Sequence, residues 1–413
     1  MTEQAAQSTT VRRRRVFYIP GYDPIHPRRY RELYRKEGAA QAEISDYSLT
    51  LKPKQTGRAY GWHVESEQDG VAVAADVEVL VWSDIVRDSM SNTIPATYAQ
   101  LVRTAWEYIA TGALWRLMKL RKGPVIAALY PIGALLLQLV LALVLGWYSF
   151  VVAAFGAGWL IGGWTIWPAM VLGLAVVWSV LRWFKAKDGK VFAYYLMHDY
   201  AYSARWRGAN PPALEARMAA FGDSIAQALT EDWDEVLVVG HSSGAHLGVS
   251  ILADLVRGGR VPAEGPALGF LSLGQVVPMV SFLRDAHRLR RDLHDLSARP
   301  ELTWVDVTAP GDGCAFALCD PVSVSGVAPE GKKWPLVFSA QFTKSLSPER
   351  WKALRWKFFR LHFQYLCAFD RPLDYDYFRI TAGPLTLAAR YADRPPSASR
   401  IDYAVSKYRG MAP

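Results

Sequence analysis

The chain has 413 residues, of which 51% are hydrophobic and 16 are tryptophan, and its formal net charge is +9. This length allows one large domain with an insertion, and the hydrophobic content suggests a membrane segment. A nucleic-acid partner is disfavoured, because the basic residues lie beside an apolar middle segment and in dispersed helices, without an RNA- or DNA-binding motif. Three cysteines are too few for a disulfide framework and fit a reducing compartment.

The N-terminal part of the chain predicts a tail followed by a buried strand. Residues 1–11 are expected to form a disordered tail, and no signal peptide is predicted. The apolar run from Val16 to Pro20 predicts a strand that ends at Gly21 and Tyr22. These two residues are also compatible with a plain turn from a strand to a helix, and we expect that helix to run to about residue 41.

Extended segments and helices precede the apolar middle of the chain. Between residues 47 and 82 three extended runs alternate with turn signals, and Ala75 to Trp82 predicts a second core strand. Residues 96–122 are expected to be helical and to end in a basic cluster. Residues 12–122 are therefore predicted to form the first part of an α/β domain.

The middle of the chain predicts a membrane hairpin. Residues 123–181 contain no charged side chain, and because one span needs about 20 residues, this length predicts two spans and a turn. The middle of the stretch is punctuated by Gly156, Gly158, Gly162, Gly163 and Pro168. We assign the hairpin to residues 123–184. A pair of buried core helices is the alternative, but neither helix has a polar face. Since neither span contains an ionisable side chain, a channel or transporter is disfavoured.

Basic residues flank both ends of the predicted hairpin: Arg116, Lys119, Arg121 and Lys122 before it, and Arg182, Lys185, Lys187 and Lys190 at its end and after it. By the positive-inside rule both ends are cytoplasmic. The sequence therefore predicts a multi-pass protein of the cell (inner) membrane with its main domain and both termini in the cytoplasm. The lipid bilayer is its expected partner, and the oligomeric state stays open.

The segment from Asp234 to Ala253 predicts a strand, a sharp bend and a helix. Val236 to Gly240 has the apolar residues of a strand buried on both faces, and helical spacing follows Gly244. Ser242 lies at the bend between two glycines, where a strained backbone requires neighbours without bulk. Its hydroxyl is expected to be exposed where free N–H groups and the helix dipole favour a developing negative charge. A glycine-rich packing turn is the alternative, but such a turn needs no serine.

The pattern Gly-His-Ser-Ser-Gly at residues 240–244 resembles the nucleophile elbow of the α/β-hydrolase superfamily, in the form common among its lipases and esterases. The resemblance covers the chain outside the hairpin. It implies an α/β fold with a mostly parallel sheet flanked by helices and interrupted here by the transmembrane hairpin. It also implies a Ser, acid, His triad in that chain order. Its oxyanion donors would be the N–H groups of Ser243 and of Gly21 or Tyr22, although many lipases carry His-Gly where this chain has Pro-Gly.

The candidate acid follows a predicted strand at Leu302 to Val307. Active-site groups gather at the carboxyl edge of an open α/β sheet, which favours Asp312 in the next loop. Asp306 and Asp320 are the alternatives, and Asp312 is also compatible with a simple Asp-Gly turn.

The candidate base is His362. It is the only one of eight histidines that follows Asp312, so the chain order implied by the resemblance leaves it by elimination. It departs from the family because residues 355–369 look helical, whereas the family keeps this histidine on a loop after the last strand, predicted here at 335–342. His241 and His246 flank the serine and are expected to line the pocket.

The sequence favours no metal or other cofactor. A group of histidines and aspartates between residues 287 and 295 lies on an arginine-rich helix, which is typical of a solvated face.

Residues 185–413 are expected to complete the domain and to carry the candidate triad. The sequence predicts a membrane-anchored serine hydrolase that cleaves an acyl ester or lipid through an acyl-enzyme. The alternative is a catalytically silent hydrolase fold used as a membrane scaffold or partner-binding module, which the helical setting of His362 favours. The acyl length, and the choice among ester, thioester and amide, depend on pocket shape.

Overall fold

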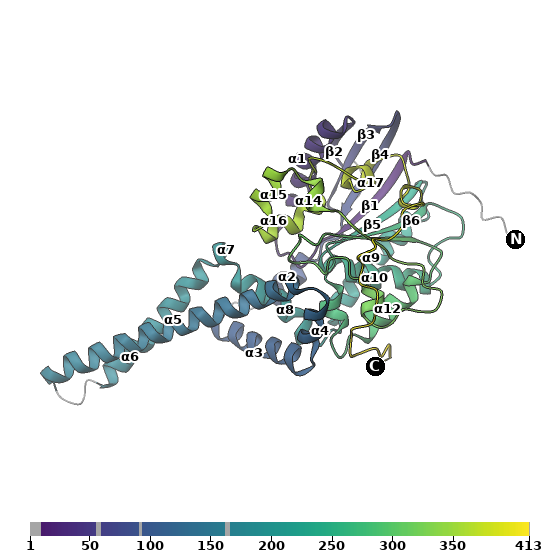
Figure 1. Cartoon of the computed structure of the whole chain (residues 1–413). Helices are drawn as coiled ribbons and strands as arrows, with labels where there is room; N and C mark the ends of the chain where they lie inside the picture. The colour runs from purple at the N-terminus through teal and green to yellow at the C-terminus, as the bar shows by residue number, and fades with distance from the viewer. Residues whose placement is uncertain (1–9, 55–58, 91–92, 162–165, 413) are drawn as a thin grey trace.

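The computed structural model describes residues 10–54, 59–90, 93–161 and 166–412 (Figure 1). Its strands are β1 (Arg13–Ile19), β2 (Ser48–Pro53), β3 (Gly61–Gln68), β4 (Val71–Val79), β5 (Glu235–His241), β6 (Ala267–Leu273), β7 (Thr303–Thr308) and β8 (Leu336–Ser339). Between β1 and β5 lie the helices α1 (Arg28–Ser45), α2 (Ser83–Ser89), α3 (Ile94–Ala110), α4 (Ala113–Leu120), α5 (Lys122–Ile161), α6 (Ile166–Ala186), α7 (Asp188–Val191), α8 (Ala193–Arg205) and α9 (Pro212–Ala228). After β5 follow α10 (Ser243–Arg257), α11 (Val277–Ser281), α12 (His287–Ser297), α13 (Pro321–Val324), α14 (Phe342–Ser345), α15 (Pro348–Leu354), α16 (Phe358–His362), the 3-10 helix η2 (Phe363–Leu366), α17 (Tyr377–Ala382) and α18 (Leu387–Arg390).

The described strands form one mixed sheet in the order β2-β3-β4-β1-β5-β6-β7-β8. The ladders β2-β3 and β3-β4 are antiparallel, and the ladders from β4 through β8 are parallel. The chain leaves β1 toward one edge of the sheet and returns to build the other half from β5 outward. The carboxyl ends of β1 and β5 therefore meet at the point where the strand order reverses, which is where open α/β sheets place their ligand sites.

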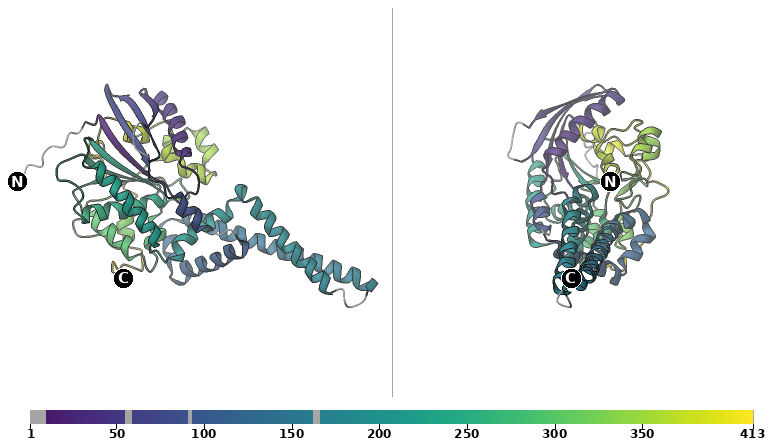
Figure 2. Two further views of the ribbon diagram at one scale, coloured as in Figure 1. Left: turned by 180° about the vertical axis from the view of Figure 1, so that it is seen from behind. Right: turned by 90° about the vertical axis from the view of Figure 1, so that its left-hand side faces the viewer.

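The two faces of the sheet pack against different helices (Figures 1 and 2). Along β1, Phe17 and Ile19 belong to a core with α9, α10 and α12, whereas Val16 and Tyr18 belong to a second core with α1 and the C-terminal helices. This alternation follows from the period of two along a strand, because successive side chains point to opposite faces. The parallel strands are buried on both faces, so β5 is apolar along most of its length.

The N-terminal residues that the structure describes are tied to the domain. Thr10 forms a bridge with Leu385, and the N–H of the fully buried Val11 donates a hydrogen bond of 2.7 Å to the carbonyl of Pro384. The expected disordered tail is therefore wrong for these two residues, because they pair with a C-terminal segment far away in the sequence. The part of that prediction at residues 1–9 lies outside the described residues.

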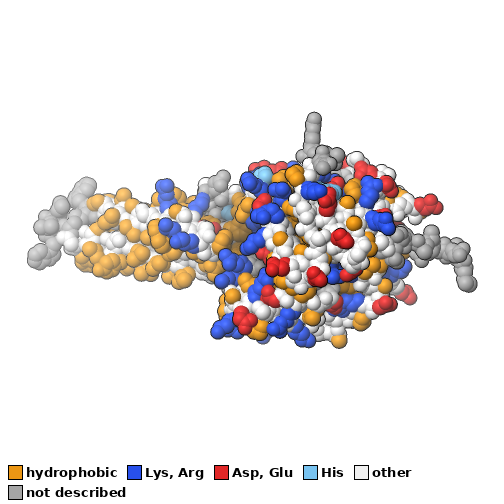
Figure 3. Space-filling view, turned by 90° about the horizontal axis from the view of Figure 1, so that it is seen from above, with side chains coloured by type: hydrophobic (Ala, Val, Ile, Leu, Met, Phe, Trp, Pro, Cys, Tyr) orange, Lys and Arg blue, Asp and Glu red, His pale blue; other side chains and the backbone are white. Residues whose placement is uncertain are grey.

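Two helices of the described chain, α5 and α6, are long and apolar enough to cross a membrane. They lie side by side and project from the domain, and the view from above shows a mainly hydrophobic surface along them with Lys and Arg side chains nearer the domain (Figures 1 and 3). Only 22% and 17% of their apolar stretches are buried, which is unlike the core helices of a soluble domain. Of the residues expected to punctuate the turn, Gly162 and Gly163 lie outside the described residues, whereas Gly156 and Gly158 belong to α5 and Pro168 to α6.

The two long helices approach each other closely at a pair of glycines. A Cβ added to Gly146 would lie 2.8 Å from the carbonyl oxygen of Gly173, and a Cβ added to Gly173 would lie 2.9 Å from the carbonyl oxygen of Gly146. Small residues at such a crossing let helices pack backbone to backbone, as they do inside membranes.

Several predicted elements are confirmed with shifted ends. The strands predicted at 16–20, 75–82, 236–240, 267–276, 302–307 and 335–342 correspond to β1, β4, β5, β6, β7 and β8. The single helix expected at residues 355–369 is wrong, because α16 ends at His362 and a 3-10 turn follows. Leu361, His362 and Gln364 to Leu366 are all buried, whereas a straight surface helix buries one stripe only.

Candidate active site

Ser242 lies at a sharp turn between β5 and α10. Its backbone has φ 56° and ψ −120°, a region that residues with a side chain rarely occupy. A Cβ on Gly240 would lie 2.6 Å from the carbonyl oxygen of Gly244, and a Cβ on Gly244 would lie 2.1 Å from that of Ile19. Both positions therefore require glycine, and the tight packing of α10 against β1 holds the strained serine in place.

The loop after β1 lies beside this serine. A Cβ added to Gly21 would be 3.0 Å from the Ser242 Cβ and 3.4 Å from its Oγ, so the Gly21 backbone passes directly over the serine. The N–H groups of Gly21, Tyr22 and Ser243 donate no hydrogen bond to any described residue. The structure thus brings the predicted oxyanion donors to the serine, with N–H groups available for a ligand.

Asp312 and His362 form a buried hydrogen-bonded pair. The Nδ1 atom of His362 lies 2.8 Å from Oδ2 of Asp312, and the two residues are 6% and 2% exposed. Because a carboxylate oxygen accepts hydrogen bonds, Nδ1 carries the proton and Nε2 is left as an acceptor. Asp312 lies in the loop after β7 as expected, and His362 reaches it from the end of α16.

Two further groups fix the Asp312 carboxylate. The Tyr365 hydroxyl donates to Oδ2 at 3.1 Å and in turn accepts the N–H of Ala309 at 2.9 Å. The N–H of Cys314 donates to Oδ1 at 2.8 Å. These bonds hold the carboxylate in one orientation toward the histidine. Tyr365 was not predicted from the sequence, because its contact with Asp312 depends on how the chain folds back after α16.

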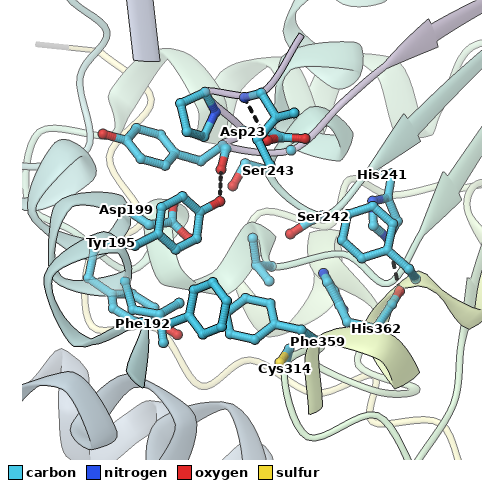
Figure 4. A pocket seen from close by; sticks show the side chains of 18 of the residues that line it. Asp23, Phe192, Tyr195, Asp199, His241, Ser242, Ser243, Cys314, Phe359 and His362 are labelled. Carbon is cyan, nitrogen blue, oxygen red and sulfur yellow. Dashed lines mark hydrogen bonds between the residues drawn. The ribbon is translucent and has the colours of Figure 1, made fainter. Parts of the chain in front are cut away.

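The side chains of Ser242 and His362 line the same pocket and lie near one another in the close view (Figure 4). No hydrogen bond joins them in the described part of the chain, and the Ser242 hydroxyl has no other partner there. Catalytic hydrogen bonds of this kind are often long without a substrate and tighten when one binds.

The alternative acids are engaged elsewhere. Asp306 accepts a hydrogen bond of 2.6 Å from Ser272, and burial raises the pKa of its carboxyl to about 8. Asp320 caps α13 through the N–H groups of Val322 and Ser323. Among the three candidate acids, Asp312 alone is hydrogen-bonded to His362.

The two histidines beside the serine have different places. His241 lines the pocket, donates through Nε2 to the carbonyl of His362 at 3.0 Å, and has a pKa far below the usual range because it is buried and next to His362. It is therefore a neutral support for the backbone at His362. His246 does not line the pocket, so that prediction is wrong. It lies about one turn further along α10, and each turn takes the helix about 5.4 Å away from Ser242.

A cavity of about 530 Å³ runs from Ser242 to the base of the two long helices. Pro124 at the start of α5 and Asp188 of α7 line it together with the serine. Phe192, between α7 and α8, and Phe359 of α16 lie on the same cavity with their ring centroids 5.4 Å apart (Figure 4). The pocket is thus bounded on one side by the sheet and on the other by helices that continue into the hairpin.

One carboxyl in this pocket was not predicted. Asp199 of α8 lines the cavity, and its carboxyl group has no hydrogen-bond partner among the described residues. Burial raises its pKa to about 7, an effect that nearby His362 reduces. A carboxyl with a strongly perturbed pKa in a cleft is a mark of functional sites. Asp199 could not be predicted from the sequence, because α8 and the turn at Ser242 are separated in the chain by α9 and β5.

Tyr195 of α8 connects the helical side of the pocket to the loop after β1. Its hydroxyl donates a hydrogen bond of 2.7 Å to the carbonyl of Tyr22 (Figure 4). The start of α8 is in turn held by Asp188, whose carboxylate accepts the N–H groups of Tyr194 and Tyr195. The position of the candidate oxyanion loop therefore depends on residues that directly follow the long helices.

A metal at this site is disfavoured by the chemistry of the available ligands. Asp312, Cys314 and His362 place potential ligand atoms within 4.8 Å of one another. Burial and the neighbouring Asp312 raise the pKa of the Cys314 thiol well above its usual range. The Asp312 and His362 atoms already bond to each other.

Comparison of the chain with protein-family models, with curated proteins and with solved structures gave no match. The function is therefore inferred from the geometry of the site itself.

Proposed function

We propose that this chain is a membrane-anchored serine hydrolase of the α/β-hydrolase type that cleaves acyl esters. The observation that carries the proposal is the strained serine at the sheet's switch point, together with a buried Asp-His pair on the same pocket. A left-handed, glycine-flanked serine between a strand and a helix is the geometry of a nucleophile elbow.

In the proposed reaction, the Ser242 oxygen attacks the acyl carbonyl while Nε2 of His362 takes the hydroxyl proton. The N–H groups of Ser243 and of Gly21 or Tyr22 stabilise the oxyanion. The alcohol leaves with the proton from His362, and the acyl group stays on Ser242. A water molecule, deprotonated by the same imidazole, then releases the carboxylic acid. Asp312 holds the imidazole tautomer and stabilises the imidazolium.

The membrane part of the proposal rests on α5 and α6. We place them in the cell (inner) membrane as a hairpin, with the α/β domain and both termini in the cytoplasm, as their basic flanks favour. Because the pocket extends to the base of these helices, a lipid or other acyl ester taken from the bilayer fits it.

The experiment is hydrolysis by the full chain reconstituted in lipid vesicles. We expect release of p-nitrophenol from a short p-nitrophenyl ester and release of fatty acid from vesicle lipid, and Ser242→Ala should reduce both by about 10⁵-fold or more. Rapid cleavage of the short ester with every lipid left intact would contradict the lipid part alone. Equal turnover by Ser242→Ala would contradict the whole proposal.

A catalytically silent scaffold is the second candidate, and the missing hydrogen bond between Ser242 and His362 favours it. A small fluorophosphonate separates the two. Labelling that vanishes in Ser242→Ala and weakens in His362→Ala supports the hydrolase. A folded sample that does not react supports the scaffold.

A further inference from the structure

A second cavity of about 90 Å³ lies next to the pocket, among the helices that join the α/β domain to the hairpin. Its walls come from α3, α4, α5, α8 and α11, and they are almost entirely aliphatic or aromatic. No charged residue lines it among the described residues. An uncharged cavity of this kind suits a hydrocarbon chain and disfavours a polar ligand.

The side cavity and the main pocket share a thin wall. Tyr108, Tyr200 and Met279 line both. The Tyr108 hydroxyl donates to the carbonyl of Met279 at 2.8 Å, which fixes the tyrosine, whereas the unbranched Met279 side chain has several low-energy conformations. A change of the Met279 rotamer is therefore the movement that we expect to join the two spaces.

The far end of the side cavity reaches the surface next to the membrane hairpin. Ile109 of α3 and Leu129 of α5 line it and are 51% and 40% exposed. Such exposed apolar residues beside a membrane-spanning helix face lipid rather than water in the proposed orientation. The cavity thus lies between the bilayer surface and the main pocket.

The main pocket, unlike the side cavity, also has charged side chains in its lining. They are Asp23, Arg29, Asp188, Asp199 and Arg360. A substrate with one apolar and one polar end would therefore be oriented by the two spaces, with its hydrocarbon part in the side cavity and its polar part among these charged groups.

We propose that the side cavity binds the acyl chain of the substrate, so that the enzyme selects long-chain acyl esters of membrane lipids and holds their alcohol part in the main pocket. This inference rests on the proposed function. In the bound state the acyl chain passes Met279, its carbonyl lies at Ser242, and its methyl end points toward Ile109 and Leu129. The preference for long chains follows because each methylene removed from water is worth roughly a factor of four in binding.

The test uses p-nitrophenyl esters of increasing acyl length and the full chain in vesicles. Ala128 of α5 lines the side cavity, so Ala128→Phe should fill it. We expect at least about a tenfold loss of kcat/KM for the long esters, with the butyrate ester changed by less than about twofold. Ala110→Phe is the control, because Ala110 is exposed on α3 and lines neither space. An equal loss for every ester, or none, would overturn the inference.

A second measurement needs no variant. A fluorophosphonate with a long alkyl chain and a terminal photoreactive group is allowed to react with the wild-type protein and is then irradiated. Crosslinks in α3 or in the first turns of α5 support the inference, and crosslinks near Phe192 and Phe359 overturn it. If a short fluorophosphonate labels Ser242 while the crosslinks fall near Phe192 and Phe359, only the acyl site fails. If neither probe reacts, the proposed function fails.

Discussion

The two sides of the pocket are built in different ways. On the sheet side, Ser242, Gly21 and Asp312 follow the ends of strands. Packing there leaves no room for a Cβ at Gly240 or Gly244, and buried hydrogen bonds hold Asp312. On the helical side, Phe192 lies between α7 and α8, and Tyr195 lies in α8. The Tyr195 hydroxyl donates a hydrogen bond to the Tyr22 carbonyl in the loop after β1, and the ring of Tyr202 packs 5.6 Å from that of Tyr22.

The sheet side of the pocket thus holds the groups proposed to react, and the helical side borders the entrance for the substrate. A strained turn such as that at Ser242 persists only where many surrounding contacts hold it, and the packed sheet side provides those contacts. The helical side has exposed aromatic rings and a residue with a left-handed backbone at Phe192, so we expect its geometry to depend on the two long helices next to it. Substitutions on the sheet side should therefore abolish turnover or folding, whereas those on the helical side should modulate them.

The largest effect on the sheet side is expected from Asp312→Asn. Loss of the acceptor for His362 Nδ1 favours the wrong imidazole tautomer, and kcat should fall on the order of 10³ to 10⁴. Asp320→Asn, at the rival acid, should stay within about threefold of wild type because Asp320 bonds to α13. Turnover of short esters in vesicles measures both. The reverse order of effects would place the acid at Asp320.

Gly244→Ala should act on folding rather than on chemistry. The new Cβ would lie 2.1 Å from the Ile19 carbonyl oxygen, so α10 must move away from β1. We expect the free energy of unfolding to fall by about 3 kcal/mol or more. Gly222→Ala in α9 is the control, because its Cβ meets only side chains at 3.6 Å and beyond, and it should be neutral or stabilising. Denaturant unfolding in detergent measures both, and equal stability of the two variants would refute the close packing.

On the helical side, Asp199→Asn should change how stability depends on pH. Since burial raises the Asp199 pKa to about 7, the folded protein binds this proton more tightly than the unfolded chain does. The stability that this carboxyl contributes is complete below about pH 4 and is lost as the pH rises to about 7. At pH 8 the asparagine variant should therefore be more stable than wild type by about 1 to 3 kcal/mol, with little difference at pH 4.

Unfolding at pH 4, 6 and 8 measures this effect. The matched control is Asp223→Asn, an exposed carboxyl on α9, which should be nearly neutral across that range. A stability difference for Asp199→Asn that is the same at each pH would show that the carboxyl titrates normally.

The smallest effect is expected from Tyr195→Phe. It removes the hydroxyl bond to the Tyr22 carbonyl and so loosens the loop that carries the oxyanion donors. We expect kcat to fall by about fivefold with little change in KM, since one neutral hydrogen bond is worth roughly 1 kcal/mol. Tyr202→Phe on the same helix is the control, because the Tyr202 hydroxyl is buried without a partner among the described residues. Equal kcat values for the two variants would show that the helical side does not position the loop.

The sheet side was largely predictable from the sequence, and the helical side was not. Ser242, its glycines and Asp312 lie where local rules place them, at turns that follow apolar strands. His362 was found by elimination and not from its surroundings. The sequence around it has a helical pattern, whereas in the fold the α-helix ends at His362 and a 3-10 helix follows.

The residues that the sequence missed act through long-range contacts. Tyr365 reaches Asp312 and Tyr195 reaches Tyr22 across 53 and 173 positions of the chain, and no spacing rule connects them. In the sequence, Asp199 is a single acidic residue in a helix of ordinary composition. Only the fold shows that it lines the pocket. His246 was wrongly expected to line the pocket, because its closeness to Ser242 in the sequence suggested closeness in space.

Trapping the acyl-enzyme is the most direct test of the nucleophile. Wild-type protein in vesicles is mixed with a p-nitrophenyl ester, quenched with acid within the first turnover, and digested for mass spectrometry. A peptide containing Ser242 that has gained the mass of the acyl group is the predicted result, and it should be absent from Ser242→Ala. Turnover with no acylated peptide, or with the acyl group on another residue such as Cys314, would contradict it.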